Sequence, residues 1–296
     1  DAGGSVCRFL PRYGRSYLLR NHQKIALADR DRALIGGFNI DADYFADIEA
    51  QGWRDFGLIV EGPAAAHLAG YFDAILGWAR NPRAKIRTLN NIVGRWSEKR
   101  GRLRWSFGGP NRRLSPWARA LKHDMATAKR LDVIAAYFAP NPGTLRRIGR
   151  IAKRGAVRIM TASKSDNNMT IAAARHCYAR LLRRNARIWE YQPTRLHTKI
   201  FVVEDVAYVG SANFDMRSLY LNLEIMLRIE DAGFATWLRG HVDREAVDSR
   251  EATLDLLRTH ARWLTRLKWR IAYFVVGVVD YTVTRRLNFG SAGAVN

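Results

Sequence analysis

Two stretches of the chain, NHQKIALADRDRALIGGFNI at residues 21–40 and LHTKIFVVEDVAYVGSANFD at residues 196–215, share one arrangement. Each has a His and a Lys two residues apart, an apolar run, an acidic residue, a second apolar run, a pair of small residues and an Asn. The separations nearly agree, with 17 residues from His22 to Asn39 and 16 from His197 to Asn213. A repeat at matched spacing indicates two related units rather than a chance pairing of His and Lys.

The periodicity of each stretch predicts a β-hairpin. In a strand, residues two apart project from the same face, so the His and the Lys of each stretch point together. In the first stretch, the polar segment 28–32 separates two apolar runs and predicts a turn that includes Asp29. The second stretch predicts a matching turn at Glu204 and Asp205. Each hairpin should bring one His, one Lys and one Asn to its open end.

The residue types at these open ends suit a phosphodiester. Lys and Asn can neutralise and hydrogen-bond phosphoryl oxygens, while His can act as a nucleophile or proton donor near neutral pH. Two such sets facing each other supply one attacking imidazole and one general acid, so the chemistry requires no metal and no other cofactor. The candidate site comprises His22, Lys24, Asn39, His197, Lys199 and Asn213, with Gly37 and Ser211 as small residues where phosphate can approach the backbone.

The two stretches resemble the paired HxKxxxxD motifs of the phospholipase D superfamily, and their surroundings resemble its bacterial cardiolipin synthase branch. The segments concerned are RNHQK, GGFNI, WRDFGLIVEGP, LHTK, GSANFDMRS and LNLEI. The resemblance implies an α/β fold in which two halves, related by a pseudo-twofold axis, share one active site. It also implies a covalent phosphohistidine that passes its phosphoryl group to water or an alcohol, with His22 as nucleophile and His197 as acid.

The second stretch departs from the motif at its acidic position. Counting from His22 gives Asp29, whereas counting from His197 gives Glu204. The predicted turn lies five residues from Lys199, or roughly 16 Å along an extended strand. We therefore expect this motif carboxylate to shape the turn or pair locally rather than to contact phosphate. The alternative is that Glu204 marks an inactive half.

A second repeated pair of carboxylates follows the hairpins. WRDFGLIVEGP (53–63) and NLEIMLRIEDA (222–232) both have the pattern of strands and align Asp55 with Glu224. An imidazole used in acid–base catalysis usually has its second nitrogen held by a carboxylate, which fixes the tautomer. By resemblance to the acids of the family, Asp55 is expected to hold His22, and Glu224 to hold His197. The alternative is a pair of ordinary salt bridges at strand ends.

The composition limits the class of protein and its partners. The chain has 296 residues, enough for two domains, and 48% of them are hydrophobic. A net charge of +22, from 49 Lys and Arg against 27 Asp and Glu, favours a polyanionic partner such as anionic lipid or nucleic acid. The two cysteines argue against a disulfide framework, and the seven histidines show no metal-ligand spacing.

The second half of the chain alternates between helical and strand patterns. Ser115 and Pro116 predict the start of a helix that extends to about residue 130. Strands are predicted at 132–138, 157–160 and 186–191, with one helix ending at 154 and another over 170–184. This alternation predicts a largely parallel sheet with helices on both faces.

We divide the chain into four parts on these grounds. They are a first phospholipase D-like half (1–80), a basic linker (81–102), a second half (103–250) and a basic-aromatic helical tail (251–296). Only 21 residues, including a predicted strand at 6–10, precede His22, whereas 93 separate Arg104 from His197. The first half is therefore expected to lack roughly 70 residues at its N-terminus.

The tail combines aromatic and basic residues over 261–290. Its apolar stretch 271–283 contains Asp280 and spans 13 residues, whereas a membrane-spanning helix needs ~20. The Trp, Tyr, Arg and Lys residues on either side suit a helix at the surface of anionic lipid. The alternative is a terminal helix packed on the body of the protein.

Three functions remain open on the sequence alone. The first is a phosphatidyltransferase that passes a phosphatidyl group from a lipid such as phosphatidylglycerol to an alcohol acceptor, with phospholipase D hydrolysis as a side reaction. The second is a metal-independent nuclease or phosphodiesterase, and the third is a non-catalytic binding protein with a relic site. The resemblance and the tail favour the first. They imply a protein at the bacterial inner membrane, facing the cytoplasm or peripheral, whose acceptor and oligomeric state the sequence does not specify.

Overall fold

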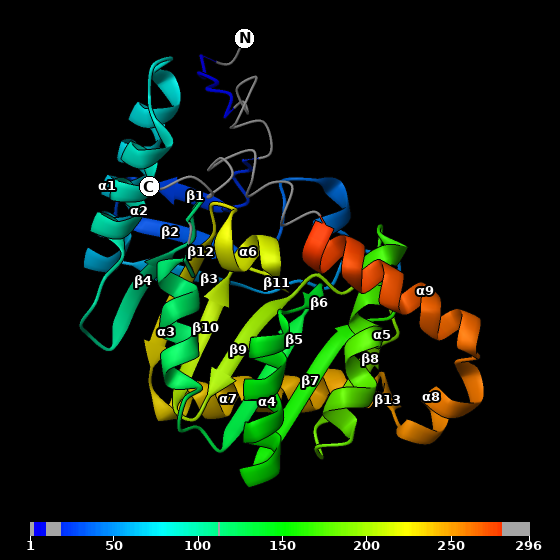
Figure 1. Cartoon of the computed structure of the whole chain (residues 1–296). Helices are drawn as coiled ribbons and strands as arrows, with labels where there is room; N and C mark the ends of the chain where they lie inside the picture. Colours follow the sequence, from blue (N-terminus) through cyan, green and yellow to red (C-terminus); the bar gives the residue numbers. More distant parts are fainter. Residues whose placement is uncertain (1–2, 10–18, 112, 280–296) are drawn as a thin grey trace, which may run out of the picture.

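The centre of the molecule is a mixed sheet of eight strands with helices on both faces (Figure 1). The computed structural model describes residues 3–9, 19–111 and 113–279. Within them the strands follow the order β13-β8-β7-β5-β9-β10-β12-β4. Their bounds are β4 (Leu103–Phe107), β5 (Arg130–Ala135), β7 (Ala156–Ala162), β8 (Arg187–Tyr191), β9 (Lys199–Val203), β10 (Val206–Gly210), β12 (Ile225–Glu230) and β13 (Ser249–Ala252).

Four helices cover this sheet. They are α3 (Pro116–Asp124), α4 (Pro142–Arg154) and α5 (Asn168–Leu182) on one face, and α7 (Ala232–Val247) on the other. The predicted strands and helices of the second half are confirmed, most of them to within about two residues at each end. The helix expected to extend to residue 130 instead ends at Asp124, because the chain must turn before Arg130 begins β5.

The prediction of a largely parallel sheet is wrong. Among the described strands of the large sheet, only β5–β7 and β7–β8 are parallel pairs. The other five pairs of the large sheet are antiparallel. The reason is that the second motif hairpin occupies the middle of the sheet, where β9 pairs antiparallel with both β5 and β10.

The first motif lies in a separate three-stranded antiparallel sheet. Its strands are β1 (Ile25–Ala28), β2 (Arg32–Gly36) and β3 (Gly57–Glu61), and a short 3-10 helix, η1 (Ala42–Tyr44), precedes β3. Helices α1 (Pro63–Arg80) and α2 (Ile86–Trp96) follow. The segment 81–102, expected as a linker, thus contains α2, which buries Leu89 and Val93. Residues 6–9, expected as a strand, have no regular structure, and residue 10 lies outside the described residues.

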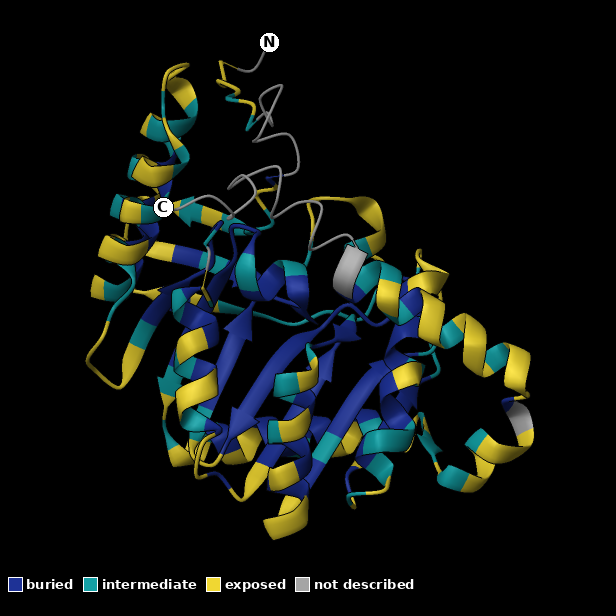
Figure 2. Cartoon of the chain, in the orientation of Figure 1, coloured by how far each residue is buried: buried dark blue, intermediate teal, exposed yellow. Residues whose placement is uncertain are grey.

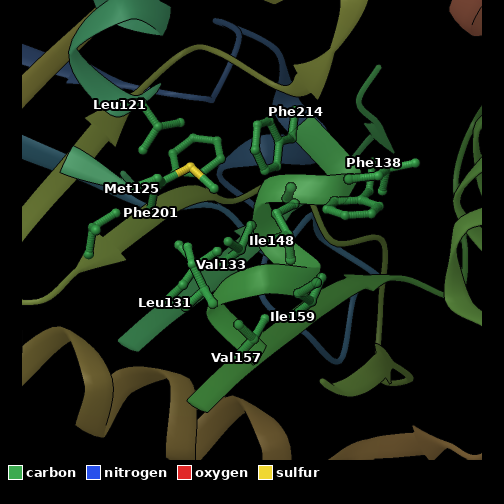
Figure 3. Packing of buried hydrophobic residues seen from close by; sticks show 14 of the residues in the cluster. Leu121, Met125, Leu131, Val133, Phe138, Ile148, Val157, Ile159, Phe201 and Phe214 are labelled. Atoms are coloured by element: carbon green, nitrogen blue, oxygen red, sulfur yellow. The ribbon is translucent and has the colours of Figure 1, made fainter. Parts of the chain in front are cut away.

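Two hydrophobic clusters fix the relation between these parts. The first lies between the large sheet and α3, α4 and α5. Figure 3 shows part of it, with Leu121 of α3 and Ile148 of α4 beside strand residues such as Val133 and Ile159. The second joins the two sheets, because Ile35 and Val60 of the small sheet pack in one buried cluster with Trp105, Phe107 and Leu227 of the large sheet. Figure 2 shows the central strands buried and the outer helix surfaces exposed. The shared cluster sets the position of the first motif against the second.

Short elements beside the second motif form a separate two-stranded sheet. β6 (Phe138–Ala139) and β11 (Phe214–Asp215) form a parallel pair, and α6 (Met216–Tyr220) follows β11. Because Asn213 directly precedes β11, this pair holds the end of the second motif against the core.

The described part of the tail is helical. It forms α8 (Leu254–His260), α9 (Trp263–Phe274) and one π-helical turn, η2 (Val275–Val279), and α9 lies across α5 (Figure 1). Ala272 is buried, and the Tyr273 hydroxyl donates a hydrogen bond of 2.7 Å to the Pro140 carbonyl. One face of α9 therefore packs on the body, as the alternative prediction held. No helix of the described residues has the length and apolar character to cross a membrane.

Candidate active site

Both motifs form the predicted hairpins. β1 and β2 pair with Ile25 opposite Ile35, and β9 and β10 pair with Val203 opposite Val206. The motif acids lie in the turns, where Asp29 and Glu204 adopt left-handed backbone conformations with φ of 49° and 48°. The His and Lys of each motif therefore lie at the opposite end from the motif acid, as predicted.

Two parallel bridges join the halves at the histidines. His22 donates its backbone N–H to the carbonyl of Leu223 over 2.9 Å, and His197 donates its N–H to the carbonyl of Arg54 over 2.7 Å. Leu223 and Arg54 are the residues that precede the two repeated acids in the sequence. Each motif His is thus bound through its backbone to the segment that carries the acid of the other half.

The carboxylates consequently pair across the halves. His22 Nδ1 lies 3.0 Å from Glu224 Oε2, and His197 Nδ1 lies 2.7 Å from Asp55 Oδ2. This corrects the expectation that Asp55 holds His22 and Glu224 holds His197. An alignment of the two strands gives the order of residues within each half, but it does not show which strand lies across from which histidine.

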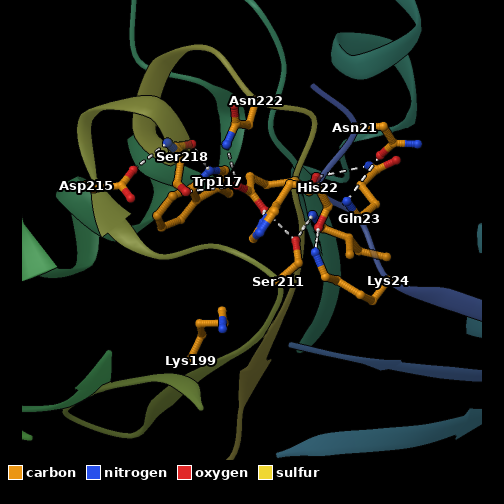
Figure 4. Close-up of polar contacts among 12 residues, drawn as sticks. Asn21, His22, Gln23, Lys24, Trp117, Lys199, Ser211, Asp215, Ser218 and Asn222 are labelled. Carbon is orange, nitrogen blue, oxygen red and sulfur yellow. Dashed lines mark hydrogen bonds and ion pairs between the residues drawn. The ribbon is translucent and has the colours of Figure 1, made fainter. Parts of the chain in front are cut away.

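Glu224 is held by a dense set of hydrogen bonds (Figure 4). Oε2 accepts from the Ser211 hydroxyl at 2.5 Å, and Oε1 accepts from the Ser218 hydroxyl at 2.8 Å and from Asn222 Nδ2 at 3.3 Å. Burial alone would raise the pKa of Glu224, but the interactions with His22 and Ser211 outweigh it, and the pKa is lowered. Glu224 therefore stays ionised and fixes the N–H of His22 at Nδ1.

The surroundings of Asp55 differ from those of Glu224 because Gly37 lies against this carboxylate. A Cβ atom on Gly37 would lie 2.6 Å from Asp55 Oδ1, so only glycine leaves room for this carboxylate. Gly37 takes the place of Ser211 in the repeat but offers no hydroxyl. Burial raises the pKa of Asp55 to about 6, opposed by Lys199 and by the backbone N–H of Phe56. Gly37 and Ser211, expected to contact phosphate, instead contact the two acids.

The two lysines occupy equivalent positions. Lys24 Nζ donates to the carbonyl of His22 at 2.9 Å, and Lys199 Nζ donates to the carbonyl of His197. Burial lowers the pKa of both, and that of Lys199 falls to about 7 although Asp55 opposes the shift. An anionic phosphoryl group would supply the negative charge that these buried ammonium groups lack.

His197 is enclosed by aromatic rings that sequence reasoning missed. The rings of Tyr44 and Trp53 lie edge-on to the imidazole, with centroids at 5.1 and 5.3 Å. Burial, followed by the charge of Lys199, lowers the pKa of His197 well below its usual value. Both aromatic residues come from the segment between β2 and β3, where Tyr44 ends η1, and this segment has no periodicity from which their position could be predicted.

The two motif asparagines differ. Asn39 is exposed, and its Nδ2 donates to the Tyr44 hydroxyl at 3.3 Å. Asn213 is buried, and its Oδ1 has no hydrogen-bond partner in the described part of the chain. Asn213 thus has the free polar atom expected of a substrate-binding side chain, whereas Asn39 makes a contact within its own loop.

The two motif acids have different surroundings. Glu204 Oε1 accepts hydrogen bonds from the backbone N–H groups of Lys129 and Arg130, the latter at 3.0 Å, and so ties the turn to the start of β5. Glu204 thus lies at the turn as expected, but its partners are 75 and 74 residues away in the sequence rather than within the hairpin. Asp29 is exposed at its turn.

We predict that Glu204→Gln leaves kcat/KM within about twofold, because a glutamine oxygen can still accept these backbone hydrogen bonds. Lys199→Met, which keeps much of the buried stem, should lower kcat/KM by about 10²- to 10³-fold, the usual loss when one donor to a developing oxyanion is removed. Both values can be measured on a soluble phosphodiester, with circular dichroism to confirm folding. Equal losses in two folded variants would contradict the hairpin geometry.

We also predict that the protein takes up protons when it binds dimethyl phosphate at about pH 7.5. The anion should raise the pKa of Lys199 from about 7 and that of the neutral His197, because its charge favours both cationic forms. Affinity should therefore fall as the pH rises above about 7. Calorimetry in two buffers of different ionisation enthalpy measures the uptake, and Lys199→Met should reduce it. Proton release on binding would overturn this electrostatic account.

Comparison with known proteins identifies the second half. Residues 121–245 match the family model described as "Cardiolipin synthase, PLD-like domain". The chain carries a phospholipase D-like domain. This domain holds His197, Lys199 and Glu224, whereas His22 and Asp55 lie outside the matched residues and reach the site through the two backbone bridges.

Relatives of the phospholipase D-like domain include cardiolipin synthases. The chain is 29% identical over 262 residues to cardiolipin synthase A of Pseudomonas aeruginosa (strain LESB58), covering 86% of this chain and 52% of that protein. It is 30% identical over 222 residues to cardiolipin synthase of Geobacillus thermodenitrificans, covering 73% and 44%. The chain therefore spans about half the length of the curated relatives that it matches.

A solved structure supports the fold. The crystal structure of phosphatidylserine synthase from Haemophilus influenzae Rd KW20 matches with a TM-score of 0.62 at 16% identity, over 90% of this chain and 71% of that one. The α/β fold with a mixed central sheet is therefore shared over most of the chain. The predicted resemblance to phospholipase D-like proteins is confirmed by the family model that matches residues 121–245.

Proposed function

We propose that the protein is a phosphatidyltransferase that moves a phosphatidyl group from a phospholipid to an alcohol through a phosphohistidine. The observation that carries the proposal is the reciprocal pairing of two histidines with carboxylates from opposite halves, each beside a lysine that donates to the carbonyl of that histidine. Similarity to cardiolipin synthases over most of the chain favours phospholipid as the donor. A lipid such as phosphatidylglycerol fits this donor role.

The first half-reaction forms a covalent adduct on His22. Glu224 holds the N–H at Nδ1, which leaves the lone pair on Nε2 to attack phosphorus. As the N–P bond forms, the bond from phosphorus to the leaving alkoxide breaks, and His197 donates a proton to that oxygen. Lys24, Lys199 and Asn213 hold the phosphoryl oxygens.

The second half-reaction reverses these roles. His197, now neutral, removes the proton of the acceptor alcohol, and the alcohol oxygen attacks phosphorus. The N–P bond breaks, and His22 returns to its starting state with Nδ1–H still held by Glu224. Hydrolysis follows the same course when water replaces the alcohol.

The charge of the substrate makes His197 an acid. In the free site, burial and the neighbouring cations Lys199 and Lys24 favour the neutral imidazole. A bound phosphodiester anion offsets these cations and favours the imidazolium. The proton donor is therefore formed when substrate binds, and it is held in orientation by Asp55.

A second candidate function is phosphodiester hydrolysis on nucleic acid. The net charge of +22 favours it, because a strongly basic protein attracts a polyphosphate backbone. The catalytic groups would act in the same way on either substrate.

Parallel assays on phosphatidylglycerol vesicles and on DNA, in buffer containing EDTA, test the proposal. We expect conversion of phosphatidylglycerol to cardiolipin-type lipid and free glycerol, no DNA cleavage, and loss of turnover in His22→Gln. Cleavage of DNA without lipid turnover would support the second candidate. Turnover of neither substrate by the folded protein would support the non-catalytic alternative.

A further inference from the structure

A cleft rich in arginine lies between α5, α8 and α9, separate from the catalytic residues. Its volume is about 530 Å³, and its apolar wall includes Leu254, Leu257, Trp269 and Tyr273. The arginines that line it are Arg175, Arg180, Arg183, Arg258, Arg266 and Arg270. No residue that lines it belongs to the candidate active site.

Most of these arginines lack an acidic partner. Arg175 pairs with Glu190, and Arg258 pairs with Asp255 at 3.4 Å. The other four, Arg180, Arg183, Arg266 and Arg270, form no ion pair with any residue in the described ranges, and no Asp or Glu is among the described residues that line the cleft. Uncompensated cations around one cavity create a field that favours an anion, and guanidinium groups match phosphate in particular.

The cleft adjoins an exposed apolar stripe on α9. This stripe consists of Trp263, Leu264, Leu267, Ile271 and Phe274, whose exposed fractions run from 44% to 72%. Their spacing of three and four residues places them on one face of the helix, while Ala272 and Tyr273 face α5 on another. Helical spacing places Arg266 and Arg270 along one border of the stripe, and both also line the cleft. Figure 2 shows the outer surface of α9 exposed along its length.

We propose that α9 lies in the surface of an anionic bilayer, with its apolar stripe among the acyl chains and a phospholipid phosphate in the arginine cleft. A bilayer surface presents hydrocarbon directly beside anionic phosphate, the same order in which α9 presents apolar and basic side chains. Nucleic acid offers phosphate but no hydrocarbon layer for five large apolar side chains. The partner of this face is therefore anionic lipid.

A chain of contacts connects this docking helix to the second motif. The Tyr273 hydroxyl is bound to the carbonyl of Pro140, directly after β6, and β6 pairs with β11, which begins one residue after Asn213. Docking through α9 would therefore set the position of the second motif relative to the membrane. The cleft is a second lipid site that holds the protein at its substrate surface.

Vesicle co-sedimentation of the full chain tests this proposal without any measurement of catalysis. The vesicles contain phosphatidylcholine alone or phosphatidylcholine with phosphatidylglycerol. We expect binding only to the mixed vesicles, and a loss of at least about tenfold in the double variant Arg266→Glu/Arg270→Glu, since each basic group near the surface contributes about 1 kcal/mol. Ile271→Gln should weaken binding by about tenfold, the effect of withdrawing one large apolar side chain from hydrocarbon.

Matched controls carry the same changes elsewhere. Arg87→Glu/Arg95→Glu makes the same charge change at exposed positions of α2, and Val247→Gln replaces an exposed apolar residue at the end of α7. Both should bind within about twofold of the parent, and circular dichroism confirms that every variant is folded. If the α2 variant weakened vesicle binding equally, the effect would be one of general charge, and the proposed phosphate site in the cleft would be overturned. Unchanged vesicle binding in the α9 variants would overturn the assignment of lipid as the partner. Loss of DNA binding by these variants, with vesicle binding retained, would also overturn it.

Discussion

His197→Gln is expected to retain one rapid turnover on a p-nitrophenyl phosphodiester, whereas His22→Gln is expected to lose all turnover. The p-nitrophenolate leaving group needs no proton, so attack by His22 can still form the adduct when the acid is missing. The second half-reaction needs His197 as the base, so the adduct should accumulate. Stopped-flow absorbance should show a burst of about one equivalent followed by a steady rate at least about 10²-fold below that of the parent.

Peptide mapping of the trapped phosphoryl group completes this test. Label on His22 in the His197→Gln variant agrees with the proposed roles. A burst from His22→Gln with label on His197 would exchange the roles of the two histidines. Inversion at phosphorus in a single step, with no adduct in any folded variant, would discard covalent catalysis.

The crossed carboxylates predict a second pair of large effects. Asp55→Asn acts on His197, so it should keep the burst and lower the steady rate by about 10³- to 10⁴-fold, the scale seen when the acid that orients a catalytic His is amidated. Glu224→Gln acts on His22, so it should slow the burst itself by a similar factor. Burst and steady rates on the same p-nitrophenyl substrate distinguish the two variants.

Glu204→Gln provides the matched control for these changes, because it also converts an acid to an amide but lies at the hairpin turn. It should leave both phases nearly unchanged. If Asp55→Asn slowed the burst and Glu224→Gln spared it, each acid would act on the histidine of its own half, contrary to the structure. Thermal melting of each variant separates these kinetic effects from a loss of folding, since both carboxyl side chains are buried and Glu224 bonds to Ser211 and Ser218.

The sequence by itself determined the local parts of the site. The alternation of apolar and polar residues set which side chains share a strand face, and the polar segments set the turns, so both hairpins formed as predicted. The residue types His, Lys and Asn indicated phosphodiester chemistry without reference to the fold. The position of Glu204 at a turn also followed from counting along a strand, and its backbone contacts agree. The strand faces and the turns depend on neighbours close in sequence, whereas the partners of Glu204, Lys129 and Arg130, lie 75 and 74 residues away.

The tertiary structure alone decided how the parts meet. Asp55 faces His197, and Glu224 faces His22, because backbone bridges and one shared hydrophobic cluster hold the small sheet against the large one. The mixed direction of the large sheet, the contact of Gly37 with Asp55 and the enclosure of His197 by Tyr44 and Trp53 have the same origin. Such contacts join residues up to about 200 positions apart, and local periodicity carries no information about packing over that separation.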